Sequence, residues 1–120
     1  MLRAASRLPI IADESCRTAA DIPRLVGAVD GINIKLSKCG SLREALRMIA
    51  VAHAHQMSVM VGCMMESSLG ITAAAHLTPL LDYADLDGAA LLKVDPFRGA
   101  TIAGGHVTLP TGPGLGVTKR

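Results

Sequence analysis

The sequence predicts an α/β fold in which parallel strands alternate with helices, and two observations support it. Four short apolar segments with strand periodicity are each separated by a segment with helical periodicity. Half of the 120 residues are hydrophobic, but only one Tyr, one Phe and no Trp occur, so the core is built from aliphatic side chains. This composition suits helices packed on a parallel sheet within a single domain of modest size.

The first half of the chain is expected to begin with a strand over residues 8–13, LPIIAD. A short helix over 22–28 follows, because Asp21 is a good N-cap and Pro23 falls in the first turn, where proline is tolerated. The next strand is predicted over 31–36, where Ile and Leu alternate with polar residues. The first strand–helix–strand unit is therefore complete by residue 36.

A second helix is predicted over 41–56, since Ser41 and Glu44 form a capping box and the apolar residues that follow recur at helical spacing. The remaining segments continue the alternation: a strand over 58–63, a helix over 67–77 and a strand over 83–87. Four parallel strands with intervening helices are the result.

The pattern changes after Gly88, and the chain is expected to divide into two parts. Residues 1–99 form the β/α portion, and residues 100–120 form a small hairpin followed by a glycine-rich tail. The hairpin is predicted over 100–110, with its turn at two consecutive glycines.

Composition excludes several classes of function. The net charge is +2 and no basic run occurs, so no nucleic-acid partner is expected. The uncharged stretch 48–65 contains histidines, a glutamine and a serine near its middle and changes period there, so no membrane span is expected. Three cysteines without metal-ligand spacing, Cys16, Cys39 and Cys63, favour reduced thiols and a cytoplasmic location.

Charged residues lie at the carboxyl ends of the predicted strands. Lys35, Asp85 and Asp87 alternate with the apolar residues that face the helices, so they point to the opposite face of the sheet. In an open sheet, a second layer of helices would bury them at high cost. A TIM-type β/α barrel instead opens at this end, where such folds place their active sites.

An inward lysine that faces carboxylates indicates proton-transfer chemistry. Asp13 ends the first strand and Glu66 follows the third, and carboxylates at a barrel mouth are able to hold a divalent cation. Glu66 is expected either to line the substrate pocket or to cap the helix that follows. Glu14 is expected either to bond within its turn or to act beside the metal, whereas Lys38 is expected to be solvated.

Four motifs in order, PIIADES, INIKLSKCG, VGCMMESS and ADLDG, together with the closing LPTGPGLGV, resemble the C-terminal half of the enolase superfamily. The resemblance is to the muconate-lactonizing and mandelate racemase branch, and within it to the dipeptide epimerases typified by L-Ala-D/L-Glu epimerase. It implies the C-terminal half of a β/α barrel and an isomerase that moves a proton α to a carboxylate through an enediolate stabilised by Mg²⁺.

The same resemblance implies a role for each matching residue. Lys35 corresponds to an acid/base lysine and Asp13 to one of three metal-binding carboxylates. Asp85 and Asp87 correspond to the pair that holds the ammonium group of a dipeptide substrate, and attraction between unlike charges agrees with that role.

The resemblance also implies an incomplete site, because the other two metal carboxylates and a second lysine have no counterpart in the sequence. The chain is therefore expected to be inactive alone. Its two unpaired sheet edges are expected to pair with a missing N-terminal half or with another copy in a homo-oligomer. Two alternatives remain: a related cycloisomerase or o-succinylbenzoate synthase-like enzyme, and an orphan fragment without catalytic activity.

Overall fold

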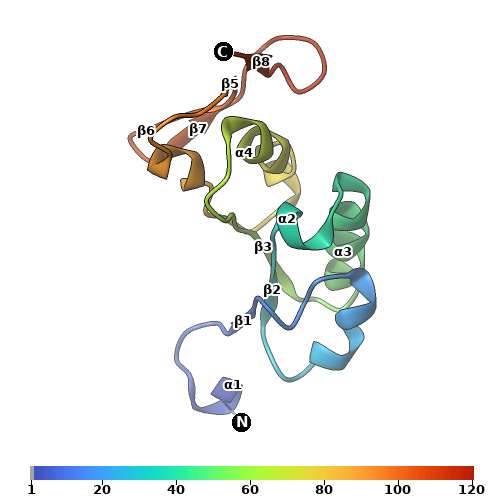
Figure 1. Ribbon diagram of the computed structural model, residues 1–120. Coiled ribbons are helices and arrows are strands. Elements are labelled where there is room, and N and C mark those ends of the chain that lie inside the picture. The colour runs from blue at the N-terminus through green and yellow to red at the C-terminus, as the bar shows by residue number, and fades with distance from the viewer. Residues whose placement is uncertain (1) are drawn as a thin grey trace.

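A four-stranded parallel sheet forms the centre of the computed structural model, which describes residues 2–120 (Figure 1). The order of the strands in the sheet is their order in the sequence, as in a barrel wall. Their bounds are β1 Ile11–Ala12, β2 Gly31–Ile34, β3 Ser58–Val61 and β4 Tyr83–Ala84. The predicted α/β fold is therefore confirmed.

Two longer helices cover one face of this sheet. Helix α3 (Leu42–Ala54) begins where predicted, because the Ser41 hydroxyl accepts a hydrogen bond from the Glu44 amide at 3.1 Å. Its buried residues pack on β2 and β3 in one hydrophobic cluster. Helix α4 (Ser68–Ala75) packs in a second cluster with Val61 and Leu86. The remaining helices are short: α1 Leu2–Ala5, α2 Leu36–Cys39, η1 Ala19–Asp21, η2 Pro23–Leu25, η3 Thr78–Leu80 and η4 Gly88–Leu91.

Several predicted elements differ from the structure, and the strands expected over 8–13 and 83–87 are shortened to Ile11–Ala12 and Tyr83–Ala84. The helix expected over 22–28 is instead a single 3₁₀ turn, η2, which follows η1, and the chain turns away at Gly27 with a φ of 80°. The strand expected to reach residue 36 ends at Ile34, and α2 begins at Leu36. This one-turn helix ends at Gly40, whose φ of 82° suits glycine.

The strands are in a register that separates two faces. Ile34 pairs with Val61, and Val61 with Ala84; Asn33 pairs with Met60, and Met60 with Tyr83. Ile32, Ile34, Val59 and Val61 are fully buried beneath the helices. We call the other face, which no helix of residues 2–120 covers, the open face; it carries Asn33, Lys35, Met60, Tyr83 and Asp85.

The C-terminal segment contains two small antiparallel pairs. Strands β6 (Thr101–Ala103) and β7 (His106–Thr108) form the predicted hairpin, which turns at Gly104 and Gly105, both with positive φ. Strands β5 (Phe97–Arg98) and β8 (Thr118–Lys119) also pair. That second pair was not predicted, since two-residue strands show no measurable alternation.

Side chains of α4 hold the C-terminal segment in place. Asp95 accepts hydrogen bonds from the amide of Ser68, at 2.8 Å, and from its hydroxyl. The Thr72 hydroxyl donates to the Ser68 carbonyl and accepts from the amide of Ala100 at 2.7 Å, all within buried surroundings. A side chain at Gly99 would collide with Thr72, so the close approach requires glycine there.

The change Thr72→Val is expected to destabilise the fold by about 1–3 kcal/mol, because it leaves the buried Ala100 amide without an acceptor. Urea denaturation measures the loss, and hydrogen exchange of the Ala100 amide should accelerate. Thr108→Val is the matched control, since that residue is exposed and its hydroxyl makes no hydrogen bond within residues 2–120. Equal effects of the two changes would contradict the assigned role of Thr72.

Helix length also bears on membrane insertion. The longest helix among the described residues, α3, has 13 residues, whereas a spanning helix needs about 20 apolar residues. Within residues 2–120, no helix is long and apolar enough to cross a membrane.

Candidate active site

The carboxyl ends of the four strands bring the predicted site residues to one edge of the sheet. Asp13 directly follows β1, Lys35 directly follows β2, and Asp85 directly follows β4. Because the strands are parallel, these ends lie side by side, as at the mouth of a barrel. The side chains form two groups, one on each side of β3.

The first group centres on an ion pair between Lys35 and Asp13. The Lys35 Nζ lies 2.7 Å from Asp13 Oδ2, and the two side chains are only 13% and 28% exposed. The Asn33 amide donates to the same carboxylate oxygen at 3.2 Å. The structure therefore brings together the lysine and the aspartate that the sequence predicted to share a cavity.

Lys38 joins this group, and the prediction that it is solvated was wrong. Its Nζ lies 3.1 Å from Asp13 Oδ1 and 2.6 Å from Glu14 Oε1, and its side chain is 19% exposed. Helix α2 is the cause, because one turn of helix places residue 38 back over residue 35. Glu14 thus contacts the group through Lys38.

Both lysines affect the protonation of the carboxyl groups. Partial burial alone would raise the pKa of Asp13, but hydrogen bonds and charges from Lys35 and Lys38 outweigh it and hold the pKa below its usual value. The hydrogen bond from Lys38 likewise lowers the pKa of Glu14, and the one to Glu14 raises the pKa of Lys38. Asp13, Glu14 and Lys38 are consequently charged at neutral pH.

Asp13 is expected to make the free energy of unfolding depend on pH in the acidic range. The pKa of Asp13 is lower in the folded state than its unfolded value near 3.8. Its contribution to the free energy of unfolding is therefore complete above pH 3.8 and is lost as the pH falls through the folded-state pKa. Urea unfolding of the wild type and of Asp13→Asn should differ most above pH 5 and converge toward pH 2. A difference that stays constant with pH would contradict this assignment.

The space between the two groups is kept open by a glycine. A Cβ at Gly62 would lie 2.7 Å from the Asn33 amide nitrogen, so only glycine leaves room for that side chain. The Asn33 Oδ1 atom is buried and has no hydrogen-bond partner among the described residues. This acceptor and the Asp13 carboxylate are oxygen donors of the type that Mg²⁺ prefers. The residues around Asp13 therefore have the chemistry of part of a magnesium site, to which they would offer one carboxylate and one amide oxygen.

The second group contains Asp85, Asp87 and Cys63. One ligand atom from each lies within 4.8 Å of the others, and both aspartates are exposed. Burial, and to a smaller extent the two carboxylates, raise the pKa of the Cys63 thiol. Two close carboxylates without a basic partner among residues 2–120 form an acidic patch that attracts a cation.

The two groups face each other across β3. The amides of Gly62 and Asp85 donate to the carbonyls of Ile34 and Val61 at 2.9 Å, which continues the ladder one position beyond the strands. Lys35, Gly62 and Asp85 are then in register, with Lys35 and Asp85 about 10 Å apart at their Cα atoms, two strand spacings.

Glu66 makes no hydrogen bond to either group, but its charge is among those that raise the pKa of the Cys63 thiol. Its carboxylate accepts a hydrogen bond from the Met64 amide at 3.0 Å and lies against Gly70 in the first turns of α4. It does not cap that helix, because the Ser68 amide donates to Asp95 instead. Lys38, Asn33 and Cys63 are site residues that sequence reasoning did not assign, although Asn33 and Cys63 lie at predicted strand ends.

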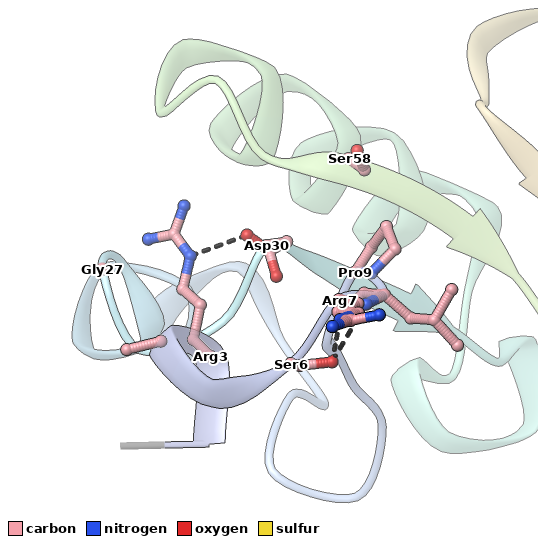
Figure 2. Close-up of a pocket in the computed structure, with 9 residues that line it drawn as sticks. Arg3, Ser6, Arg7, Pro9, Gly27, Asp30 and Ser58 are labelled. Carbon is pink, nitrogen blue, oxygen red and sulfur yellow. Dashed lines mark hydrogen bonds and ion pairs between the residues drawn. The ribbon is translucent and has the colours of Figure 1, made fainter.

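Two cavities among residues 2–120 lie away from both groups. One, of about 620 Å³, is at the amino ends of the strands and is lined by residues such as Arg3, Arg7, Asp30 and Ser58 (Figure 2). Within it, Arg3 Nε is 2.6 Å from Asp30. Another, of about 560 Å³, lies beside α4 and Asp95. The candidate site lies on the open face, which no helix of residues 2–120 covers.

Comparison with known proteins shows the family. The model of the family described as Enolase C-terminal domain-like matches residues 1–120. L-Ala-D/L-Glu epimerase of Bacteroides thetaiotaomicron is 50% identical over 114 residues, 95% of this chain and 30% of the relative. L-Ala-D/L-amino acid epimerase of Maribacter sp. is 54% identical over 112 residues, 92% of this chain and 33% of the relative. The chain thus spans about a third of the length of these relatives.

Solved structures of epimerases are also similar to this chain. The substrate-liganded L-Ala-D/L-Glu epimerase of Bacillus subtilis superposes with a TM-score of 0.88 at 38% identity, over 97% of this chain and 34% of that chain. The dipeptide epimerase of Cytophaga hutchinsonii, complexed with Mg and the dipeptide D-Ala-L-Val, gives a TM-score of 0.90 at 39% identity, over 99% of this chain and 34% of that chain. The expected C-terminal portion of a β/α barrel is confirmed by these superpositions.

Proposed function

This chain belongs to the Enolase C-terminal domain-like family, and from that membership we propose that it is the C-terminal barrel portion of a magnesium-dependent dipeptide epimerase. The observation that carries the proposal is the arrangement at the strand ends, with the Lys35–Asp13 pair on one side of Gly62 and the Asp85–Asp87 patch on the other. The relatives named as dipeptide epimerases support the choice of substrate.

In this proposal Lys35 transfers the proton at the carbon α to the substrate carboxylate. Its Nζ is mostly buried on the open face and held at 2.7 Å by Asp13, so its position is fixed before substrate arrives. Asp85 and Asp87 hold the ammonium group of the dipeptide, which sets the distance of the α-carbon from Lys35. A magnesium ion bound at Asp13 and Asn33 would supply positive charge that stabilises the carboxylate when the proton leaves.

One lysine reaches only one face of the α-carbon, whereas inversion needs a proton donor on the opposite face. We therefore propose that the chain acts only when a second proton-transfer group and further metal ligands are supplied from outside residues 1–120. Residues 1–99 are the barrel portion in this proposal, and residues 100–120 are a hairpin and tail that fasten to α4 through the segment beginning at Asp95.

A chimera tests the proposal. The segment of the Bacteroides thetaiotaomicron epimerase that matches this chain is replaced by residues 1–120, since the two are 50% identical over 114 residues. Incubated in D₂O with Mg²⁺ and L-Ala-L-Glu, the chimera is expected to exchange the α-proton of the glutamate residue, as followed by NMR. The host without the segment is the control, and a folded chimera that exchanges no proton would overturn the proposal.

The aspartate pair separates a dipeptide epimerase from a cycloisomerase-like relative whose substrate has no ammonium group. Changing both Asp85 and Asp87 to Asn in the chimera is expected to raise KM for the dipeptide roughly 10- to 100-fold, the loss of a charge-assisted contact. An unchanged KM would show that these carboxylates do not bind the ammonium group.

A further inference from the structure

Lys38 is a mostly buried lysine to which the proposed function gives no role. Its side chain is 19% exposed, and its Nζ lies 3.1 Å from Asp13 Oδ1 and 2.6 Å from Glu14 Oε1. Holding a long side chain in one position costs conformational entropy, and removing its ammonium group from water costs solvation. A lysine without a specific role would extend its amine into the solvent instead.

The side chains that bond to the Asp13 carboxylate within residues 2–120 all come from the segment 33–38. The amine of Lys35, at 2.7 Å, and the amide of Asn33, at 3.2 Å, both contact Oδ2. Lys38 is the partner of the other oxygen, Oδ1. Because rotation about the Cβ–Cγ bond of an aspartate has no sharp minima of its own, the Lys38 contact fixes the plane of this carboxylate.

Two short turns of the backbone set the distances in this arrangement. Lys35 is the N-cap residue of α2, and the amide of Lys38 donates to the Lys35 carbonyl at 2.9 Å. Residues three apart on a helix lie on the same face, so both amines reach one carboxylate. After β1, the Cys16 amide donates to the Asp13 carbonyl at 3.0 Å, which holds the turn that carries Asp13 and Glu14. Lys38 therefore joins the two turns.

We propose that Lys38 is a positioning residue of the reaction, which holds the Asp13 carboxylate in the orientation that places the Lys35 amine for proton transfer. The inference rests on the proposed function, and Lys38 acts through Asp13 rather than on the substrate. A displacement of about 1 Å in a reacting group lowers a rate by as much as 10²-fold, so a carboxylate that is free to rotate is enough to slow the reaction.

The two contacts of Lys38 differ in kind. Two ammonium groups against the one carboxylate of Asp13 would leave a net charge of +1, and the Glu14 carboxylate brings the sum to zero. The Glu14 side chain is 73% exposed, so water replaces much of this outer contact when it is lost. The inner contact joins side chains that are 19% and 28% exposed. The inner contact is therefore the one that the positioning role requires.

Kinetics of the epimerase chimera test the role. Lys38→Met removes the charge and keeps the length of the side chain. It is expected to lower kcat for α-proton exchange roughly 10- to 100-fold and to change KM for L-Ala-L-Glu less than about threefold, because Asp85 and Asp87 still bind the ammonium group. Lys38→Arg keeps the charge and has donors for both carboxylates, so it is expected to restore kcat to within about fivefold of the wild type.

Two further variants are matched to these. Glu14→Gln removes only the outer contact and is expected to lower kcat by less than about threefold. Lys93→Met makes the same change as Lys38→Met at an exposed lysine that belongs to neither group of site residues, and it should leave both kinetic constants unchanged. Wild-type kcat in Lys38→Met, or a loss that Lys38→Arg does not restore, would overturn the positioning role. An equal loss in Glu14→Gln would overturn it as well.

A double-mutant cycle measures the Lys38–Asp13 contact without any activity. Urea unfolding of the 120-residue chain at pH 7 is compared for Lys38→Met, Asp13→Asn and the double variant. The effects of the two single changes on the unfolding equilibrium constant are expected to be non-additive by a factor of about five or more, as for side chains in contact. The matched cycle of Lys93→Met with Asp13→Asn should be additive.

The outcomes separate this inference from the proposed function. Additive effects at Asp13 and Lys38, or an active chimera that is insensitive to Lys38→Met, would overturn the positioning role alone. A folded wild-type chimera that exchanges no proton would overturn the proposed function, and the role of Lys38 in the reaction with it.

Discussion

Replacing Lys35 by alanine in the epimerase chimera is expected to slow α-proton exchange roughly 10²- to 10⁴-fold, the usual contribution of a positioned general acid or base. The side chain is mostly buried, faces the uncovered wall of the sheet and has its amine fixed by Asp13, so water has no equivalent position from which to replace it. The rate of deuterium incorporation by NMR measures the effect directly.

Two further variants separate proton transfer from a structural role. Lys35→Arg keeps a positive charge beside Asp13, so folding should be retained, but a guanidinium does not release its proton at neutral pH and exchange should still be lost. Lys93→Ala removes an exposed lysine that lines the cavity beside α4 and belongs to neither group of site residues, so it should leave the rate unchanged. Exchange in Lys35→Arg close to the wild-type rate would refute an acid/base role.

Leu77→Ala is expected to reduce the free energy of unfolding by about 2–5 kcal/mol, as for other buried leucines. Leu77 is 4% exposed and belongs to the larger hydrophobic cluster, which joins α3 to β2 and β3. Removing its isobutyl group leaves a cavity that the surrounding aliphatic side chains fill only in part. Urea denaturation followed by circular dichroism measures the change.

The same substitution at Leu46 is the control. Leu46 lies on the outer side of α3 and is 47% exposed, so Leu46→Ala should change the free energy of unfolding by less than about 1 kcal/mol. If the two variants were equally stable, the packing at Leu77 would contribute nothing beyond that of a surface leucine.

The second strand was predictable because it has residues of two kinds on its two faces. Ile32 and Ile34 alternate with Asn33 and Lys35, and the structure buries the first pair while it leaves the second on the open face. Strand lengths were not predictable, since β1 and β4 are limited by pairing on one side only. A run of apolar residues does not reveal which of them have a neighbouring strand.

The contacts of the candidate site were likewise predictable only in part. The Lys35–Asp13 pair follows from two strands that end at one edge, so the sequence order was sufficient to predict it. Lys38 was assigned to solvent because α2 was not expected, and without that helical turn residue 38 has no reason to return to Asp13. Tertiary contacts of Glu66 with Met64 and Gly70 depend on a loop whose conformation no local pattern specifies.

The pairing of β8 with β5 links the last residues of the chain to helix α4. The Arg120 amide donates a hydrogen bond to the carbonyl of Pro96 at 2.9 Å. Pro96 directly follows Asp95, which accepts a hydrogen bond from the Ser68 amide at the start of α4. Deleting residues 118–120 should therefore loosen the start of α4, and any fusion partner attached at this end would need a long flexible spacer.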